Sequence, residues 1–160
     1  MIAFVMALVA TVAMPTGTST GAGTKVDAAA ADVAAAVRFA RDESSRTGNS
    51  FGVRQQQSRV RVFRLDGVTL VYDVYHPIAK QEWDIQLAKD LPYRGVQSAR
   101  SVAWRGVCNA DRNIAFRDGG TPVCTSPTTT LLDQGVLTLT LDGASRNVVI
   151  DGFTGRVSIQ

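Results

Sequence analysis

The sequence predicts an α+β fold in which one helix is followed by an antiparallel, β-rich globular domain. First, small apolar residues within 25–46 recur at spacings of three and four, which is the period of one helix face. Second, from residue 50 onward, short β-like runs alternate with Gly, Asp and Pro turn residues. Third, the runs within 137–159 are joined by connections of only a few residues, which join antiparallel strands and are too short for parallel ones. A helix followed by a run of strands is the α+β arrangement.

The composition is that of one globular domain. The chain has 160 residues, of which 45% are apolar and 19% charged, and a chain of this size buries a modest core. Its formal net charge is +3, and among its 17 basic residues only Lys25, Lys80 and Lys89 are lysines. Arginine is suited to bidentate pairing with carboxylate or phosphate. The alternative is that these arginines are solvated on exposed strand faces.

The N-terminal segment resembles part of a membrane helix. Residues 2–14 are apolar apart from one threonine and carry no charge. These 13 residues are fewer than the roughly 20 that cross a bilayer. No basic residue precedes them and no Ala-x-Ala site follows them, so the features of a cleaved signal peptide are absent. Pro15 ends the run, and the Gly/Thr/Ser-rich stretch 16–24 predicts a flexible linker. The expected organisation is a truncated membrane helix at 1–15, the linker, and a globular domain at 25–160.

The segment 25–46 is predicted to be a helix with one apolar face. Its stripe consists of Val26, Ala30, Val33, Val37 and Ala40. These small side chains permit close packing, either on the sheet of the same domain or among the helices of a fibre. We expect Val33 and Val37 to be buried and Arg41 to be exposed.

Both ends of this segment carry helix-end signals. Thr24, with Asp27 three residues later, resembles a capping box in which Asp replaces the usual Glu. Gly48 lies just past the last turn and is the residue type that terminates helices in a left-handed conformation.

The rest of the chain predicts strands. Before the C-terminal region these are 51–56, 59–65, 68–75, 83–87, 96–104 and 113–117. Asp66-Gly67 is a two-residue hairpin signal between the second and third. Leu137, Leu139 and Leu141 alternate with threonines, so one face is apolar. Turns at 142–145 and 151–154 then divide the C-terminal region into a three-stranded meander.

Two cysteines, Cys108 and Cys124, lie in a Gly/Pro/Thr-rich region. The chain has no Cys-x-x-Cys, and His76 is its only histidine, which argues against zinc, iron–sulfur and haem sites. The spacing suits a disulfide in an oxidising compartment. Two unrelated buried thiols are the alternative.

No arrangement for catalysis is evident. There is no Gly-x-Ser-x-Gly, no phosphate-binding loop and no dinucleotide fingerprint. A Cys–His pair could be drawn from Cys108 and His76, and a carboxylate pair from Glu82 and Asp84, but the latter flank Trp83 beside a short strand and indicate a solvated edge. We therefore expect no catalytic residue, no cofactor, no metal site and no small-molecule substrate.

Three segments together resemble a known family. They are residues 1–15, the helical stretch 37–48 with Ala40-Arg41-Asp42-Glu43, and the closing strands with Thr154-Gly155-Arg156-Val157. This pattern resembles the GspH/FimT family of type II secretion pseudopilins and minor type IV pilins. The resemblance implies a single-pass inner-membrane subunit, cleaved by a prepilin peptidase, with its globular domain in the periplasm. It also implies that other pseudopilins or pilins of a fibre are its partners.

The family's processing motif, Gly followed by Phe-Thr-Leu-x-Glu, is absent from the sequence. Alignment on Pro15 places it just before Met1. Adding the roughly seven residues that precede this point in the family restores a span of roughly 20, as a bilayer requires. We therefore expect the reading frame to extend upstream of Met1.

A DNA-binding role is the second reading, because some pilins of this family resemble DNA-uptake proteins with a C-terminal Gly-Arg-x-Arg. Here the residues are Gly155-Arg156-Val157-Ser158, so the second arginine is missing. The arginines that could contact DNA phosphates or a partner protein are Arg54, Arg59, Arg61, Arg64 and Arg156.

Overall fold

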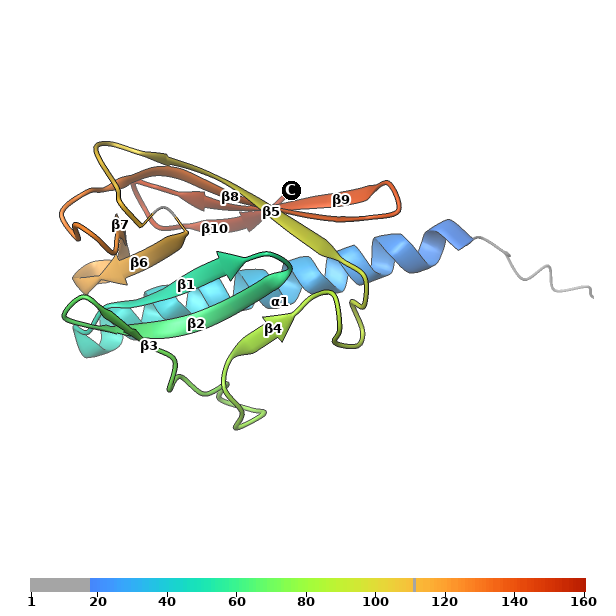
Figure 1. The fold of residues 1–160 in the computed structure, drawn as a ribbon, viewed down its shortest axis with the longest axis horizontal. Coiled ribbons are helices and arrows are strands. Elements are labelled where there is room, and N and C mark those ends of the chain that lie inside the picture. The colour runs from blue at the N-terminus through green and yellow to red at the C-terminus, as the bar shows by residue number, and fades with distance from the viewer. Residues whose placement is uncertain (1–17, 111) are drawn as a thin grey trace, which may run out of the picture.

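The computed structural model describes residues 18–110 and 112–160, and the predicted membrane segment 1–15 lies outside them. A single long helix, α1 (Thr18–Thr47), packs against two antiparallel sheets, and its first turn extends beyond them (Figure 1). The predicted α+β class is confirmed. Among the described residues, no helix is both long and apolar enough to cross a membrane.

The helix begins earlier than the sequence predicts. Gly21 and Gly23 lie within α1, so the predicted linker is wrong from residue 18 to 24. Each glycine costs a helix only about 1 kcal/mol relative to alanine, and the burial of Ala22 and Val26 in the same turns favours the helix. The predicted capping box is wrong for the same reason, and Asp27 instead forms an ion pair with Arg146 at 2.7 Å.

The end of α1 agrees with the prediction. Gly48 follows the last helical residue with a φ of 72°. Its N–H donates to the carbonyl of Ser44 at 3.0 Å, which satisfies one of the last free carbonyls of the helix. The chain then turns directly into the first strand.

The first sheet has the order β3-β2-β1-β6-β7, with β4 also paired to β2. Its strands are β1 (Phe51–Gln56), β2 (Arg59–Asp66), β3 (Thr69–Val71), β4 (Asp84–Gln86), β6 (Asn113–Arg117) and β7 (Thr121–Cys124), and the 3-10 turn η1 (Asp118–Gly120) precedes β7. The second sheet has the order β10-β9-β8-β5. Its strands are β5 (Gln97–Trp104), β8 (Leu132–Leu141), β9 (Ala144–Asp151) and β10 (Val157–Ile159). The C-terminal meander is therefore confirmed.

Three local predictions need correction. The β2–β3 hairpin forms, but Asp66 pairs with Thr69, so Gly67 and Val68 are the loop residues rather than Asp66 and Gly67. β3 is much shorter than the predicted strand 68–75. The strand β7 was not predicted, because it contains Pro122, and proline is accommodated there because β7 is at the edge of the sheet.

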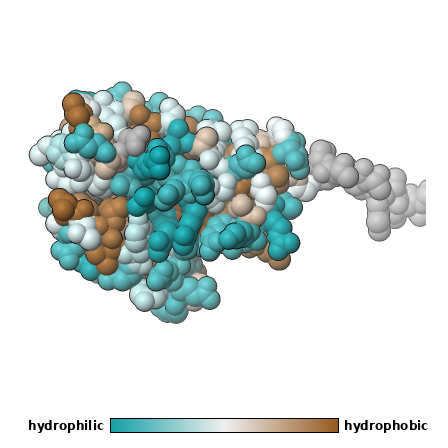
Figure 2. All heavy atoms as spheres, viewed as in Figure 1, coloured by the Kyte–Doolittle hydropathy of each residue, from teal (hydrophilic) through white to brown (hydrophobic). Residues whose placement is uncertain are grey.

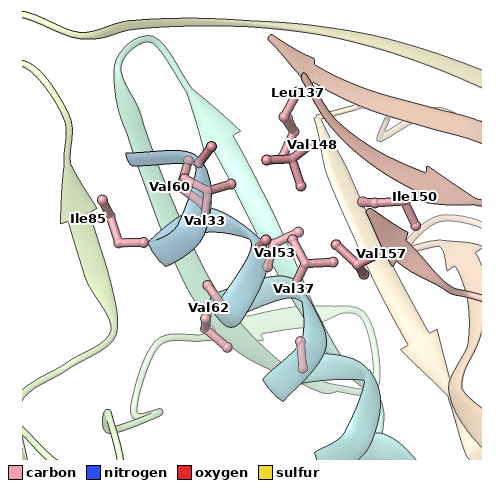
Figure 3. Close-up of a cluster of buried hydrophobic side chains, with 14 of the residues drawn as sticks. Val33, Val37, Val53, Val60, Val62, Ile85, Leu137, Val148, Ile150 and Val157 are labelled. Atoms are coloured by element: carbon pink, nitrogen blue, oxygen red, sulfur yellow. The ribbon is translucent and has the colours of Figure 1, made fainter. Parts of the chain in front are cut away.

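The core lies between the helix and the two sheets. Val33 and Val37 are completely buried, as predicted. Figure 3 shows side chains of α1, the first sheet and the second sheet converging on one another; among them are Val53, Val60, Leu137, Val148, Ile150 and Val157. The stripe of α1 therefore packs on its own domain. A smaller cluster formed by Phe63, Ala115 and Val123 is separate from this core.

Candidate assembly surfaces

A disulfide joins Cys108, in the loop after β5, to Cys124 at the end of β7, with 5.8 Å between their Cα atoms. The predicted disulfide is confirmed. It uses both sulfur atoms, so the hypothetical Cys–His nucleophile does not form. The His76 ring also has a structural role, because its Nδ1 accepts hydrogen bonds from the N–H groups of Ile78 and Ala79 at 3.2 and 3.1 Å.

A groove of about 430 Å³ lies between α1 and the loops that flank β4. Its lining includes Trp83, Tyr93 and the carboxylates of Asp32, Asp84 and Asp90. Burial, and then the nearby charge of Asp32, raise the pKa of Tyr93 to about 12. The hydroxyl therefore stays protonated at physiological pH and serves as a hydrogen-bond donor. The acidic, aromatic lining suits contacts with polar or cationic groups.

A second stripe of small residues follows the solvent-facing side of α1. It consists of Gly21, Thr24, Ala28, Ala31 and Ala35, of which Ala28 is half-buried and the rest exposed. Small residues at this period let the backbone of another helix approach closely. The three- and four-residue spacing of this stripe is visible in the sequence. The sequence alone does not say which of the two stripes faces the core, so the exposed stripe cannot be told from the buried one.

The side chain of Arg41 links α1 to the end of the chain. Arg41 is only 32% exposed, so the expectation that it is exposed needs correction. Its aliphatic stem covers Gly120 and Gly155, where an added Cβ would come within 2.9 Å of its Cγ and 3.2 Å of its Cδ, respectively. Arg38, one turn earlier, donates to the carbonyl of Val157 at 3.2 Å. Two segments that carried the family resemblance are thus in contact with each other.

The five candidate arginines separate into three groups. Arg54, Arg59 and Arg61 line one small cavity on the first sheet. Arg64 forms an ion pair with Asp73 at 3.3 Å. Arg156 lies in the connection between β9 and β10, in the other sheet. The arginines therefore do not form one continuous surface, although three of them converge.

Comparison with known proteins supports this architecture. No family model matches the sequence, and no curated protein sequence matches it. Among solved structures, the minor pseudopilin EpsH from the type 2 secretion system of Vibrio cholerae superposes with a TM-score of 0.59 at 13% identity, over 85% of this chain and 96% of EpsH. The chain has the minor-pseudopilin fold.

The same fold occurs in a pilus protein. The type IV minor pilin FimU of Pseudomonas aeruginosa superposes with a TM-score of 0.53 at 14% identity, over 86% of this chain and 89% of FimU. The predicted resemblance to GspH/FimT-type subunits is therefore confirmed in the fold. In this pseudopilin-like chain, the long helix and the β-rich head correspond to nearly the whole length of each neighbour.

Proposed function

We propose that the chain is a minor pseudopilin or minor pilin, a structural subunit of a type II secretion pseudopilus or a type IV pilus. The superposition on nearly all of EpsH is the observation that carries the proposal. The exposed stripe of small residues on α1 supports it, because fibre assembly requires helices to pack closely. The proposed role requires surfaces for assembly.

The same proposal gives the chain a place in the cell. The apolar residues 2–14 would belong to an inner-membrane anchor, and the head would lie in the periplasm. The Cys108–Cys124 disulfide supports an oxidising compartment of this kind. Other pseudopilins or pilins would be its partners, through the helix and through the head.

Cysteine cross-linking in the native host tests this role. Ala31→Cys places a thiol on the exposed stripe of α1, and Thr128→Cys places a control thiol on the exposed β7–β8 loop. We expect Ala31→Cys to form cross-links with pilin-like proteins, identified by mass spectrometry in the sheared fibre fraction, and Thr128→Cys to form fewer. The subunit role is wrong if the chain is absent from fibres and its deletion leaves both secretion and piliation intact.

A pilus-associated DNA-binding protein is the second candidate. The convergence of Arg54, Arg59 and Arg61 is the observation that favours it. Two of these arginines, however, are already paired with carboxylates, Arg59 with Asp84 and Arg61 with Glu82. Because these two guanidinium groups are less available to phosphates, we rank DNA binding below the subunit role.

A further inference from the structure

Two arginines lie next to each other on one face of the first sheet. Arg54 of β1 and Arg61 of β2 are directly opposite in the strand register. Like charges in this position normally destabilise a strand pair. Figure 2 shows hydrophilic side chains gathered over β1 and β2 on this face, with hydrophobic ones toward the β3 end. A local arrangement that costs stability is expected where a function requires it.

Tyr72 holds both guanidinium groups in place. Its hydroxyl accepts a hydrogen bond from Arg54 Nη1 at 3.1 Å. The Arg61 Cζ atom lies 3.9 Å from the centroid of the same ring, which is a cation–π contact. Tyr72 follows β3 and reaches across β2 to β1, so the two like charges are drawn together rather than separated.

The cluster has one more cation than anion within the described part of the chain. Arg59 Nε donates to Asp84 at 2.7 Å, and Arg61 lies 3.3 Å from Glu82. Arg54 pairs with no carboxylate among the described residues, and its buried Nε has no hydrogen-bond acceptor there. Among the described residues, three arginines against two carboxylates leave one positive charge without a partner.

The space between these groups is small. A partly open cavity of about 130 Å³ is lined by Arg54, Gln56, Arg59, Arg61 and Tyr72. At about 30 Å³ for each water in the liquid, this is room for roughly four waters, or for a carboxylate with its methylene group. The cavity is too small for a segment of chain, so its ligand would be the tip of one side chain.

We propose that this cavity binds a single carboxylate, supplied by an aspartate or glutamate of a neighbouring subunit. The proposal rests on the subunit role given above. One carboxylate neutralises the extra charge, and arginine can bind it through two parallel hydrogen bonds. A nucleic acid fits less well, because its backbone presents a row of phosphates. Two of the three arginines are already paired, Arg59 with Asp84 and Arg61 with Glu82, so the described cluster offers a single unpaired cation.

Acetate is the probe for this site. The full chain, labelled with ¹⁵N and held in nonionic detergent, is titrated with sodium acetate against sodium chloride at constant ionic strength. We expect the Nε–Hε resonances of Arg54 and Arg61, which line the cavity, to shift saturably with acetate but not with chloride. The Arg61 resonance also reports binding by variants that lack Arg54. Arg54→Gln and Arg54→Lys should weaken acetate binding about tenfold or more, since charge-assisted pairing is lost or reduced to one bond. Arg117→Gln, which removes an exposed arginine of the same sheet, should leave binding unchanged.

Two further arms make the test decisive. The melting temperature of each variant shows whether it is folded. A parallel titration uses inorganic phosphate, or a single-stranded DNA of twelve nucleotides, in place of acetate. Absence of a saturable acetate shift, equal binding by folded Arg54→Gln, or tighter saturation by phosphate or the oligonucleotide overturns the carboxylate site. These outcomes do not depend on a fibre, so they are distinguishable from failure of the cross-linking experiment, which overturns the subunit role.

Discussion

At the residue scale, one carboxylate organises the turn between β9 and β10. Asp151 Oδ1 accepts hydrogen bonds from the hydroxyl and the N–H of Thr154, both at 2.7 Å, and from the N–H of Phe153 at 3.1 Å. The bonds to Thr154, chiefly that of its hydroxyl, lower the pKa of Asp151. The ionised form of this exposed residue is therefore the one that the folded turn prefers.

This preference predicts a pH dependence of stability. The pKa of Asp151 is lower in the folded chain than in the unfolded chain. Its ionised carboxylate therefore stabilises the fold fully at pH values above the pKa of the unfolded chain, about 3.9, and this stabilisation is lost as the pH falls through the pKa of the folded chain. We expect Asp151→Asn to be less stable than wild type at pH 6 and to approach it near pH 2. Urea unfolding across this range measures the difference, and Asp118→Asn is a control at another exposed turn. An equal difference at both pH values would refute the prediction.

At the scale of elements, the contact between α1 and the β9–β10 turn depends on glycine. Gly155 has a φ of +66°, and a Cβ there would lie 2.6 Å from the carbonyl oxygen of Gly120. Gly119 is a matched control, because its φ is +78° but a Cβ would meet nothing within 4 Å. The two positions share a left-handed backbone and differ in the space available for a side chain.

We predict that the two alanine variants have unequal costs. Gly119→Ala should lower the free energy of unfolding by about 1–2 kcal/mol, the cost of a left-handed conformation. Gly155→Ala should cost at least about 1 kcal/mol more, because the methyl group displaces Gly120 or the Arg41 stem. Chemical denaturation of both variants measures this difference. Similar losses in the two would show that the contact adds nothing.

The elements also show what sequence reasoning can reach. The end of α1 and the strands β1 and β6 follow from local signals: apolar period, Gly48, and short β-rich runs. The first turns of α1 and the strand β7 were missed because their glycines and Pro122 disfavour regular structure locally, whereas burial and edge pairing stabilise it.

The arginine cavity could be predicted only in part. Each arginine is visible in the sequence as a candidate contact. Their convergence depends on the β1–β2 register, in which Gln56 pairs with Arg59, and on Tyr72 reaching across a neighbouring strand. Neither the register nor the reach follows from residue types. The disulfide was easier, because only two cysteines are present.

At the scale of the whole molecule, the charge distribution predicts weak binding to DNA. The net charge is only +3, and Arg156 lies in the β9–β10 connection of the second sheet, whereas the three converging arginines lie on the first. Charges separated by more than about 8 Å are largely screened at physiological salt. We expect no tight binding of duplex DNA at that salt and no effect of Arg156→Ala. Titrations at two salt concentrations test this; tight binding that Arg156→Ala abolishes would move the protein to the DNA-receptor class.

The position of α1 also has a mechanical consequence. The helix contacts β1, β2 and β6 of one sheet and β8, β9 and β10 of the other, while its first turn extends beyond both (Figure 1). A pull along the helix axis from the start of α1 would load both sheets at once, in shear along the packed face. Shear strains many contacts together, whereas peeling breaks them one after another. Under the subunit role proposed above, this geometry would pass tension applied at the start of α1 into both sheets together.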